Sequence, residues 1–125
     1  MKYIESLSQS ELNYLESKGS LKLNLHKEFF DAIKSGEKTE EYRTYNDYWE
    51  SRIEKFAKDG VFLIEFKNGY SATAPKFKAL CLYSWIEKAL DEDGDEYEFY
   101  TLEVYPLDSF EIVDELPEDT EDTEA

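Results

Sequence analysis

The segment Gly36-Glu37-Lys38-Thr39-Glu40-Glu41-Tyr42-Arg43 connects an expected helix to an expected strand. From Thr39 onward its residues predict a strand, on which Glu41 and Arg43 share one face because side chains alternate. Lys38 would point the other way on a regular strand, so we place it in the turn that follows the flexible Gly36. The three charged groups can then converge over one pocket. An ammonium, a carboxylate and a planar guanidinium can together recognise the edge of a nucleobase or an anionic group.

Spacing alone leaves a second interpretation of these charges open. Lys38, Glu41 and Arg43 could instead form a ladder of exposed ion pairs, which stabilises a fold very little. We expect replacement of Lys38 or Arg43 by Ala to change the free energy of unfolding by less than about 1 kcal/mol, because exposed polar groups seldom hold a fold together. If the group forms a site, the same substitutions should abolish ligand binding.

A strand and a helix are expected before this segment. Residues 21–25 alternate between Leu and polar side chains, which is the period of a half-buried strand. Phe29, Phe30 and Ile33 are spaced for one face of a helix, and Gly36 is placed to end it.

Helix and strand signals continue after the segment. A helical stripe with Thr44 as its expected cap closes at Gly60, and it consists of Tyr45, Tyr48, Trp49, Arg52, Ile53 and Phe56. Further strands are expected at residues 61–66, 77–86, 97–105 and 110–113. Two or three helices inserted early among mostly antiparallel strands predict an α+β fold with a curled sheet or a small β-barrel.

Length and composition indicate one domain. The chain has 125 residues, 41% of them apolar, which is too few for two independent cores. The pattern Ser8-Gln9-Ser10-Glu11 is a capping box and predicts an accessory helix within residues 1–19. Residues 20–116 then form the main domain. Residues 117–125 carry five acidic groups and no large apolar side chain, so we expect a disordered acidic tail.

The charge of the chain is distributed unevenly. The formal net charge is -16, yet all 14 basic residues lie between Lys2 and Lys88 beside 14 acidic ones. Residues 89–125 hold the other 16 acidic residues and no basic one. An electrically balanced body therefore precedes an acidic end, and the overall charge does not exclude an anionic ligand at a local site.

Most catalytic and metal-binding motifs are missing from the sequence. It has no phosphate-binding glycine loop, nucleophile elbow, HExxH or CxxC motif, so we expect neither a cofactor nor a metal. In residues 91–95 the glycine is misplaced for a calcium loop, and a solvated turn is predicted. Structural roles are expected for His26 and Cys81. One cysteine and no long apolar stretch predict a soluble cytoplasmic protein without membrane contact.

The segment also carries a family resemblance. Gly36, Lys38, Glu41 and Arg43 fill the G-x-K-x-x-E-x-R signature of ASCH domains, which belong to the PUA-like superfamily. The resemblance covers roughly residues 21–113, and within the family this part of the chain is similar to the small bacterial and phage members. Its supporting context is Tyr48-Trp49 with Arg52, and Asn68-Gly69-Tyr70-Ser71 before Pro75.

This resemblance implies a fold and a function. The expected fold is a small PUA-like β-barrel of mostly antiparallel strands with a cleft beside the signature. The expected function is binding of RNA, a nucleotide or a modified nucleoside. Lys38, Glu41 and Arg43 would contact the ligand, and Arg52 is also expected to be a ligand-binding residue. Tyr42 or Tyr70 would stack on a base, although either could equally be a core residue.

The resemblance leaves an enzymatic alternative open, because some relatives hydrolyse acylated cytidines and others are ribonucleases. Lys38 would then act as base or activate Thr39, Glu41 would assist proton transfer, and Arg43 would hold the substrate. In the amidohydrolases a catalytic Thr stands three residues after the Lys, where this chain has Glu41. Glu65 and Glu87 are candidates for their distant catalytic Glu, and the alternative for each is an exposed or ion-paired strand residue.

A third interpretation needs no cleft. The acidic C-terminal end could bind a basic protein partner, as a mimic of nucleic acid would. Removal of the tail would then abolish binding, whereas substitutions in the signature would not.

Overall fold

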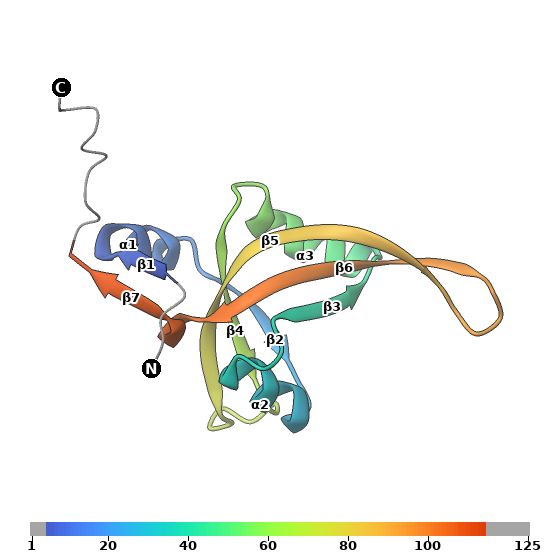
Figure 1. Cartoon of the computed structure of the whole chain (residues 1–125), viewed down its shortest axis with the longest axis horizontal. Helices are drawn as coiled ribbons and strands as arrows, with labels where there is room; N and C mark the ends of the chain where they lie inside the picture. Colours follow the sequence, from blue (N-terminus) through green and yellow to red (C-terminus); the bar gives the residue numbers. More distant parts are fainter. Residues whose placement is uncertain (1–4, 115–125) are drawn as a thin grey trace.

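The computed structural model describes residues 5–114. In chain order the elements are β1 (Glu5–Ser8), α1 (Gln9–Ser17), β2 (Ser20–Asn24), α2 (Lys27–Ser35), β3 (Glu40–Thr44), α3 (Asp47–Ala57), β4 (Phe62–Lys67), β5 (Lys76–Leu90), β6 (Glu96–Pro106), the 3-10 turn η1 (Leu107–Ser109) and β7 (Phe110–Val113) (Figure 1). The described part of the chain is thus α+β with three helices, which confirms the coarse prediction.

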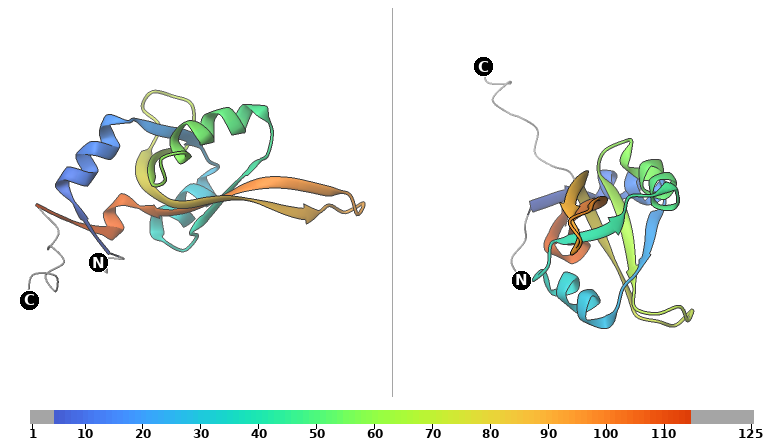
Figure 2. Two further views of the ribbon diagram at one scale, coloured as in Figure 1. Left: turned by 90° about the horizontal axis from the view of Figure 1, so that it is seen from above. Right: turned by 90° about the vertical axis from the view of Figure 1, so that its right-hand side faces the viewer.

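The main sheet is mixed and open. Its five strands lie in the order β2-β4-β5-β6-β3, with β2 and β4 parallel and the other neighbours antiparallel. Strands β1 and β7 form a separate parallel pair. The long strands β5 and β6 curve together and extend beyond the body of the molecule (Figure 2). Within the described residues β2 and β3 remain the two edges, so the sheet does not close into the expected barrel.

Hydrophobic side chains cover both faces of the middle of this sheet. On one face Phe62, Ile64 and Phe66 of β4 pack with residues of α2 and α3. On the other face Leu63 packs in a second cluster with residues of β1, α1 and β7. The continuous apolar run at the start of β4 is explained by this double burial, as the sequence predicts.

Local capping determines where the helices begin and end. Ser8 forms the predicted capping box with Glu11 at the start of α1. Gly36 ends α2 with a φ of 86°, a left-handed conformation that glycine adopts without strain. The predicted cap of α3 is wrong: Asn46 accepts the hydrogen bond from Trp49 N, and Thr44 is the last residue of β3. An Asn side chain two residues closer reaches the free amide groups of the first turn.

Two further boundaries differ from the sequence prediction. Strand β1 precedes α1 and is missing from the prediction, because four residues with one buried Leu carry little periodic signal. Strand β5 continues to Leu90, past the predicted end at residue 86. The acidic tail predicted at 117–125 lies outside the described residues. Among residues 5–114 no helix is long and apolar enough to cross a membrane.

Candidate ligand-binding cleft

A cleft lies between the two edges of the open sheet. Its volume is about 470 Å³. One wall comes from the end of β2 and the start of α2, and the other from the turn before β3 and from β3 itself. The lining residues are Asn24, Leu25, His26, Phe29, Lys38, Glu41, Tyr42 and Arg43. Three of the four signature residues therefore face one cavity.

Glu41 is the centre of the charged cluster. The residue is buried, with 7% of its surface exposed. Lys38 Nζ lies 3.3 Å from Glu41 Oε1, while Arg43 Nε and Nη2 lie 2.9 and 2.6 Å from Oε2. The carboxylate is thus held between an ammonium and a guanidinium, which compensates its removal from water.

Lys38 reaches the cluster from the turn, as the sequence predicts. The backbone amide of Lys38 donates to Ala32 O of α2, which holds the turn against the helix. The ammonium donates to the carbonyl of Glu40 and to Glu41, and it stands 5.7 and 5.1 Å from the ring centres of Phe29 and Tyr42. A lysine between two aromatic rings is partly desolvated, which strengthens its interaction with any acceptor.

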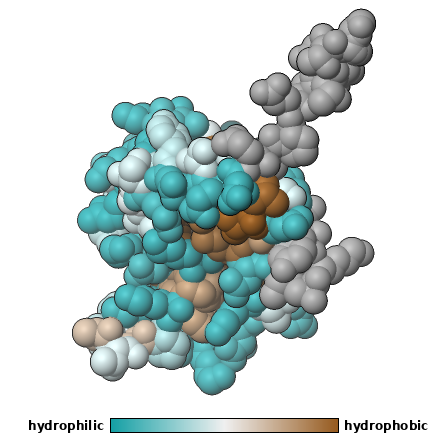
Figure 3. All heavy atoms as spheres, turned by 90° about the vertical axis from the view of Figure 1, so that its left-hand side faces the viewer, coloured by the Kyte–Doolittle hydropathy of each residue, from teal (hydrophilic) through white to brown (hydrophobic). Residues whose placement is uncertain are grey.

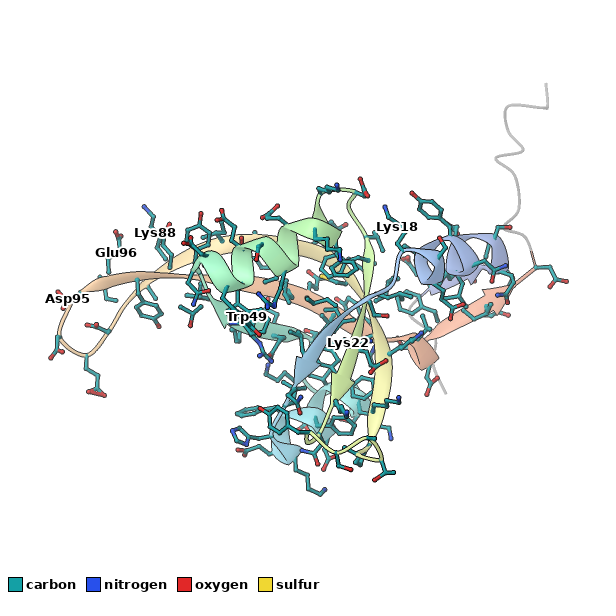
Figure 4. The ribbon with its side chains drawn as sticks, turned by 180° about the vertical axis from the view of Figure 1, so that it is seen from behind. Lys18, Lys22, Trp49, Lys88, Asp95 and Glu96 are labelled. Atoms are coloured by element: carbon teal, nitrogen blue, oxygen red, sulfur yellow. The ribbon has the colours of Figure 1, made fainter. Side chains whose placement is uncertain are left out.

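Arg43 joins the cluster to the rest of the fold. Besides its bonds to Glu41, Nη2 donates to the carbonyl oxygen of Asn24 at 3.0 Å. The guanidinium also lies 5.0 Å from the ring of Trp49, which packs against the main core (Figure 4). The interpretation as a ladder of exposed ion pairs does not fit this burial. The expectation that Arg43→Ala would barely change stability is revised, because the substitution leaves Glu41 buried with fewer donors.

Some donors of the cluster are left for a ligand. An ammonium has three N–H groups, and Lys38 uses two of them on Glu40 and Glu41. Arg43 bonds through Nε and Nη2, so within residues 5–114 its Nη1 is not engaged. Both oxygens of Glu41 already accept hydrogen bonds from the two cations. The cleft therefore offers donors beside aromatic side chains, and Glu41 positions those donors.

The structure separates the other predicted site residues. Thr39 precedes β3, and its carbonyl accepts from Val104 N, but the residue does not line the cleft. Tyr42 lines it and is half-exposed. Tyr70 is 89% exposed and lines a smaller adjoining cavity that shares Asn24, Leu25 and His26 with the cleft. It is therefore a surface residue beside the site.

Arg52 and the two candidate glutamates lie elsewhere. The Arg52 guanidinium stacks 3.5 Å from the ring centre of Tyr48 on α3 and does not line the cleft. Glu65 is on the opposite face of the sheet, 3.7 Å from Lys22 Nζ. Glu87 lines a different cavity, beyond β3. Neither glutamate completes the Lys38 site.

Sequence reasoning missed part of the cleft wall. Asn24, His26 and Phe29 line it together with the signature residues. Asn24 also accepts from Gly69 N through its side chain, which ties the end of β2 to the loop after β4. The bridge between Asn24 and Arg43 spans 19 residues, and no local pattern marks such a contact. The exposed Phe29 at the start of α2 was the one available signal.

Other candidate features carry less chemistry. Carboxylate oxygens of Asp91, Asp93 and Asp95 lie within 4.8 Å of one another on the β5-β6 turn, where Asp91 Oδ1 already accepts from two backbone amides. This is the predicted solvated turn, at the tip that Asp95 and Glu96 mark in Figure 4. A mainly apolar cavity of about 540 Å³ lies between β1, α1 and β5, at the end where Figure 3 shows hydrophobic residues among hydrophilic ones.

Comparisons with known proteins add no relative. No protein-family model matches the sequence, no curated protein matches it, and no solved structure matches its fold. The functional argument therefore depends on the geometry of the cleft.

Proposed function

We propose that this protein binds a nucleobase, as part of RNA, a nucleotide or a modified nucleoside, in the cleft between β2 and β3. The observation that carries the proposal is the buried Glu41 held between Lys38 and Arg43, which keeps two cationic donors fixed at one wall of the cavity. A volume of about 470 Å³ is in the range of small-ligand sites.

The hydrogen-bond donors of the cleft can bind the edge of a nucleobase, and its aromatic rings can pack against the face. Lys38 and Arg43 Nη1 can donate to the carbonyl oxygens and ring nitrogens of a base edge, or to a phosphate oxygen. Phe29 and Tyr42 stand beside the Lys38 ammonium and offer surfaces against which a planar base can pack. Tyr70, on the adjoining rim, can stack on a neighbouring base if the ligand is RNA.

A PUA-like, ASCH-type architecture is part of this proposal. The support is the complete G-x-K-x-x-E-x-R signature together with its placement, since its three charged residues meet in one cleft. The two sheet edges are bridged at Arg43 and Asn24, so the open sheet is joined by a side chain where a barrel would continue through backbone pairing.

Hydrolysis of an acylated nucleoside is the second candidate. Its support is the contact of 3.3 Å between Lys38 Nζ and Glu41 Oε1, which could pass a proton between a general base and a carboxylate. Thr39, the proposed nucleophile, does not line the cleft. A water molecule activated by Lys38 would have to attack the amide carbonyl in its place, with release of the amine and the carboxylic acid.

Binding and turnover can be measured with one set of proteins. The probes are the four ribonucleosides, their 5′-monophosphates, N4-acetylcytidine and single-stranded RNA of mixed sequence, titrated by calorimetry. Lys38→Ala should weaken binding about tenfold or more, since it removes a charged donor from the cavity. Chromatography of N4-acetylcytidine after incubation tests the hydrolase alternative, and gel analysis of the RNA tests cleavage.

Lys34→Ala is the matched control for this experiment. Lys34 belongs to α2, carries the same charge and stands 6.0 Å from the ring centre of Phe30, but it does not line the cleft. Its removal should change affinity only through overall charge. Equal losses for Lys38→Ala and Lys34→Ala, or no binding of any probe, would refute the proposed site.

A further inference from the structure

A second cavity lies on the other face of β3 and holds mostly aromatic and acidic side chains. Its volume is about 450 Å³. The strand register places the side chains at positions 40, 42 and 44 on the same face as 97, 99, 101 and 103 of β6 and 83, 85 and 87 of β5. The main lining residues are Glu40, Tyr42, Arg43, Glu87, Tyr97 and Phe99.

Two hydrogen bonds fix one oxygen of the Glu87 carboxylate, and its other oxygen is available to a ligand. Trp85 Nε1 and Thr101 Oγ1 both donate to its Oε2, at 2.6 and 2.9 Å. Thr101 is fully buried although it points to the outer face. Packing around Thr101 therefore helps its hydrogen bond to hold the Glu87 carboxylate in place. Within the described residues Oε1 has no hydrogen-bond donor, and no cation lies within 4.0 Å of Glu87.

Glu40, which also lines the cavity, likewise has a carboxylate oxygen without a hydrogen-bond donor among the described residues. Its Oε1 accepts from the Tyr42 hydroxyl at 2.5 Å, and its carboxylate forms no ion pair among residues 5–114. Hydrogen bonding to Glu40, burial and the nearby charges of Glu87 and Glu41 raise the pKa of Tyr42 to about 12. Arg43 also lines the cavity, but its guanidinium is bonded to Glu41 and to the Asn24 carbonyl. Within the described residues no cation therefore forms an ion pair with Glu40 or Glu87.

Aromatic rings form the remaining wall. The ring centres of Tyr42 and Tyr97 lie 5.7 and 5.8 Å from that of Phe99. Trp85, Tyr42, Tyr97 and Tyr83 are 36–64% exposed on this face. None of the residues that the register places on this face between positions 83 and 103 or in β3 is basic. Exposed rings between unpaired carboxylates attract cations.

We propose that this cavity is a docking site for an arginine side chain of a basic polypeptide. The rings of Tyr42 and Phe99 are nearly perpendicular, at 79°, so a guanidinium can stack on one of them while it donates to Glu87 Oε1 and to the free oxygen of Glu40. Charge complementarity selects this partner over RNA, because phosphates would be repelled by the same carboxylates. The cavity adjoins the nucleobase cleft and shares Tyr42 and Arg43 with it, but neither Glu40 nor Glu87 lines the cleft.

Peptide titration tests the docking site. The probe is an acetylated and amidated Gly-Arg-Gly-Arg-Gly-Arg-Gly peptide, titrated into the full chain by calorimetry at low and at physiological salt. Its control is the same peptide with citrulline in place of arginine, which keeps the planar shape and loses the charge. We expect the arginine peptide to bind, more weakly as salt rises, and the citrulline peptide not to bind.

Matched variants locate the binding. Glu87→Gln should weaken binding of the arginine peptide about fivefold or more, and Glu40→Gln should also weaken it. Glu98→Gln removes the same charge from β6 on the opposite face and should change affinity by less than about twofold. Thermal melts check that each variant is folded, and Glu40→Gln provides the test if Glu87→Gln unfolds.

Three results would overturn this proposal. They are no binding of the arginine peptide, equal binding of the citrulline peptide, and equal losses for Glu87→Gln, Glu40→Gln and Glu98→Gln. The last would show attraction by overall charge alone. A fourth result would also overturn it: a loss of affinity for single-stranded RNA in Glu87→Gln would assign this face to nucleic acid.

Discussion

Arg43 Nη2 donates to the carbonyl oxygen of Asn24 across 3.0 Å, and this bond connects the two edges of the five-stranded sheet. The same nitrogen lies 2.6 Å from Glu41 Oε2. The Arg43 side chain therefore links the two edges of the sheet and also neutralises the Glu41 carboxylate in the wall of the cleft. Substitutions at this position should affect stability as well as ligand binding.

The first prediction concerns the stability effect of Arg43. Arg43→Ala should lower the free energy of unfolding by about 2 kcal/mol, because it leaves the buried Glu41 with fewer partners and frees the Asn24 carbonyl. Arg52→Ala is the control, since Arg52 is exposed on α3 and should change stability by about 0.5 kcal/mol or less. Urea denaturation measures both. Equal effects would mean that the bridge is not structural.

The neighbouring aromatic residues Trp49 and Tyr48 give a second prediction. Trp49 packs against the core beneath α3 and beside the Arg43 guanidinium, whereas Tyr48 is 54% exposed. Trp49→Ala should cost about 3 kcal/mol by leaving a cavity, and Tyr48→Ala about 1 kcal/mol or less. Thermal and urea melts compare them. A loss for Tyr48→Ala as large as that for Trp49→Ala would contradict this packing.

The sequence predicts the local elements of this fold better than their assembly. The alternation in residues 21–25 and the glycine at the end of α2 depend on neighbouring residues, so both are correct within a residue or two. The turn that directs Lys38 toward Glu41 was predictable for the same reason. The pairing of β2 with β4 in parallel, and the contact of Arg43 with Asn24, depend on how distant segments pack. Single-sequence patterns contain no such information.

The candidate site shows the same division. Alternation places Glu41 and Arg43 on one face, but it cannot show that Glu41 is 7% exposed. It also cannot show that Glu87, a candidate for the remote catalytic residue, is fixed by Trp85 on the other side of β3. The burial of Glu41 and the position of Glu87 both depend on how distant strands pack against each other.

The third prediction concerns the stability of the protein at alkaline pH, to which the Cys81 thiol contributes. Burial raises the pKa of the Cys81 thiol from 9.0 to about 12, and burial also raises the pKa of Tyr100. Between pH 9 and pH 12 the unfolded chain loses the thiol proton while the folded chain keeps it. The unfolded state then binds fewer protons, so the free energy of unfolding falls as pH rises through this window and is unaffected by this group below it.

The measurement is urea denaturation at several pH values from about 8 to 11. Cys81→Ala should reduce the slope of stability against pH by up to about 1 kcal/mol per pH unit. The native thiol should also resist alkylation near pH 8, since it is protonated and buried. Rapid labelling of the folded protein, or an unchanged slope in the variant, would show that the thiol is accessible.

The last prediction uses two glycines with nearly the same backbone conformation. Gly36 has a φ of 86° before Lys38, and Gly94 has a φ of 83° at the tip of the β5-β6 hairpin. A Cβ at either position would meet no atom within 4 Å, so backbone strain is the main cost of an alanine. Each Gly→Ala substitution should therefore destabilise the protein by about 1 kcal/mol.

Only one of the two should affect the cleft. In Gly36→Ala the turn that brings Lys38 to Glu41 relaxes away from its left-handed conformation, so the ammonium moves and nucleobase binding weakens. Gly94→Ala should leave binding unchanged, because the hairpin tip does not line the cleft. Calorimetric titration of both variants with the nucleoside that binds wild type best compares them at matched stability. Equal affinities would mean that Lys38 reaches the cleft without help from the turn.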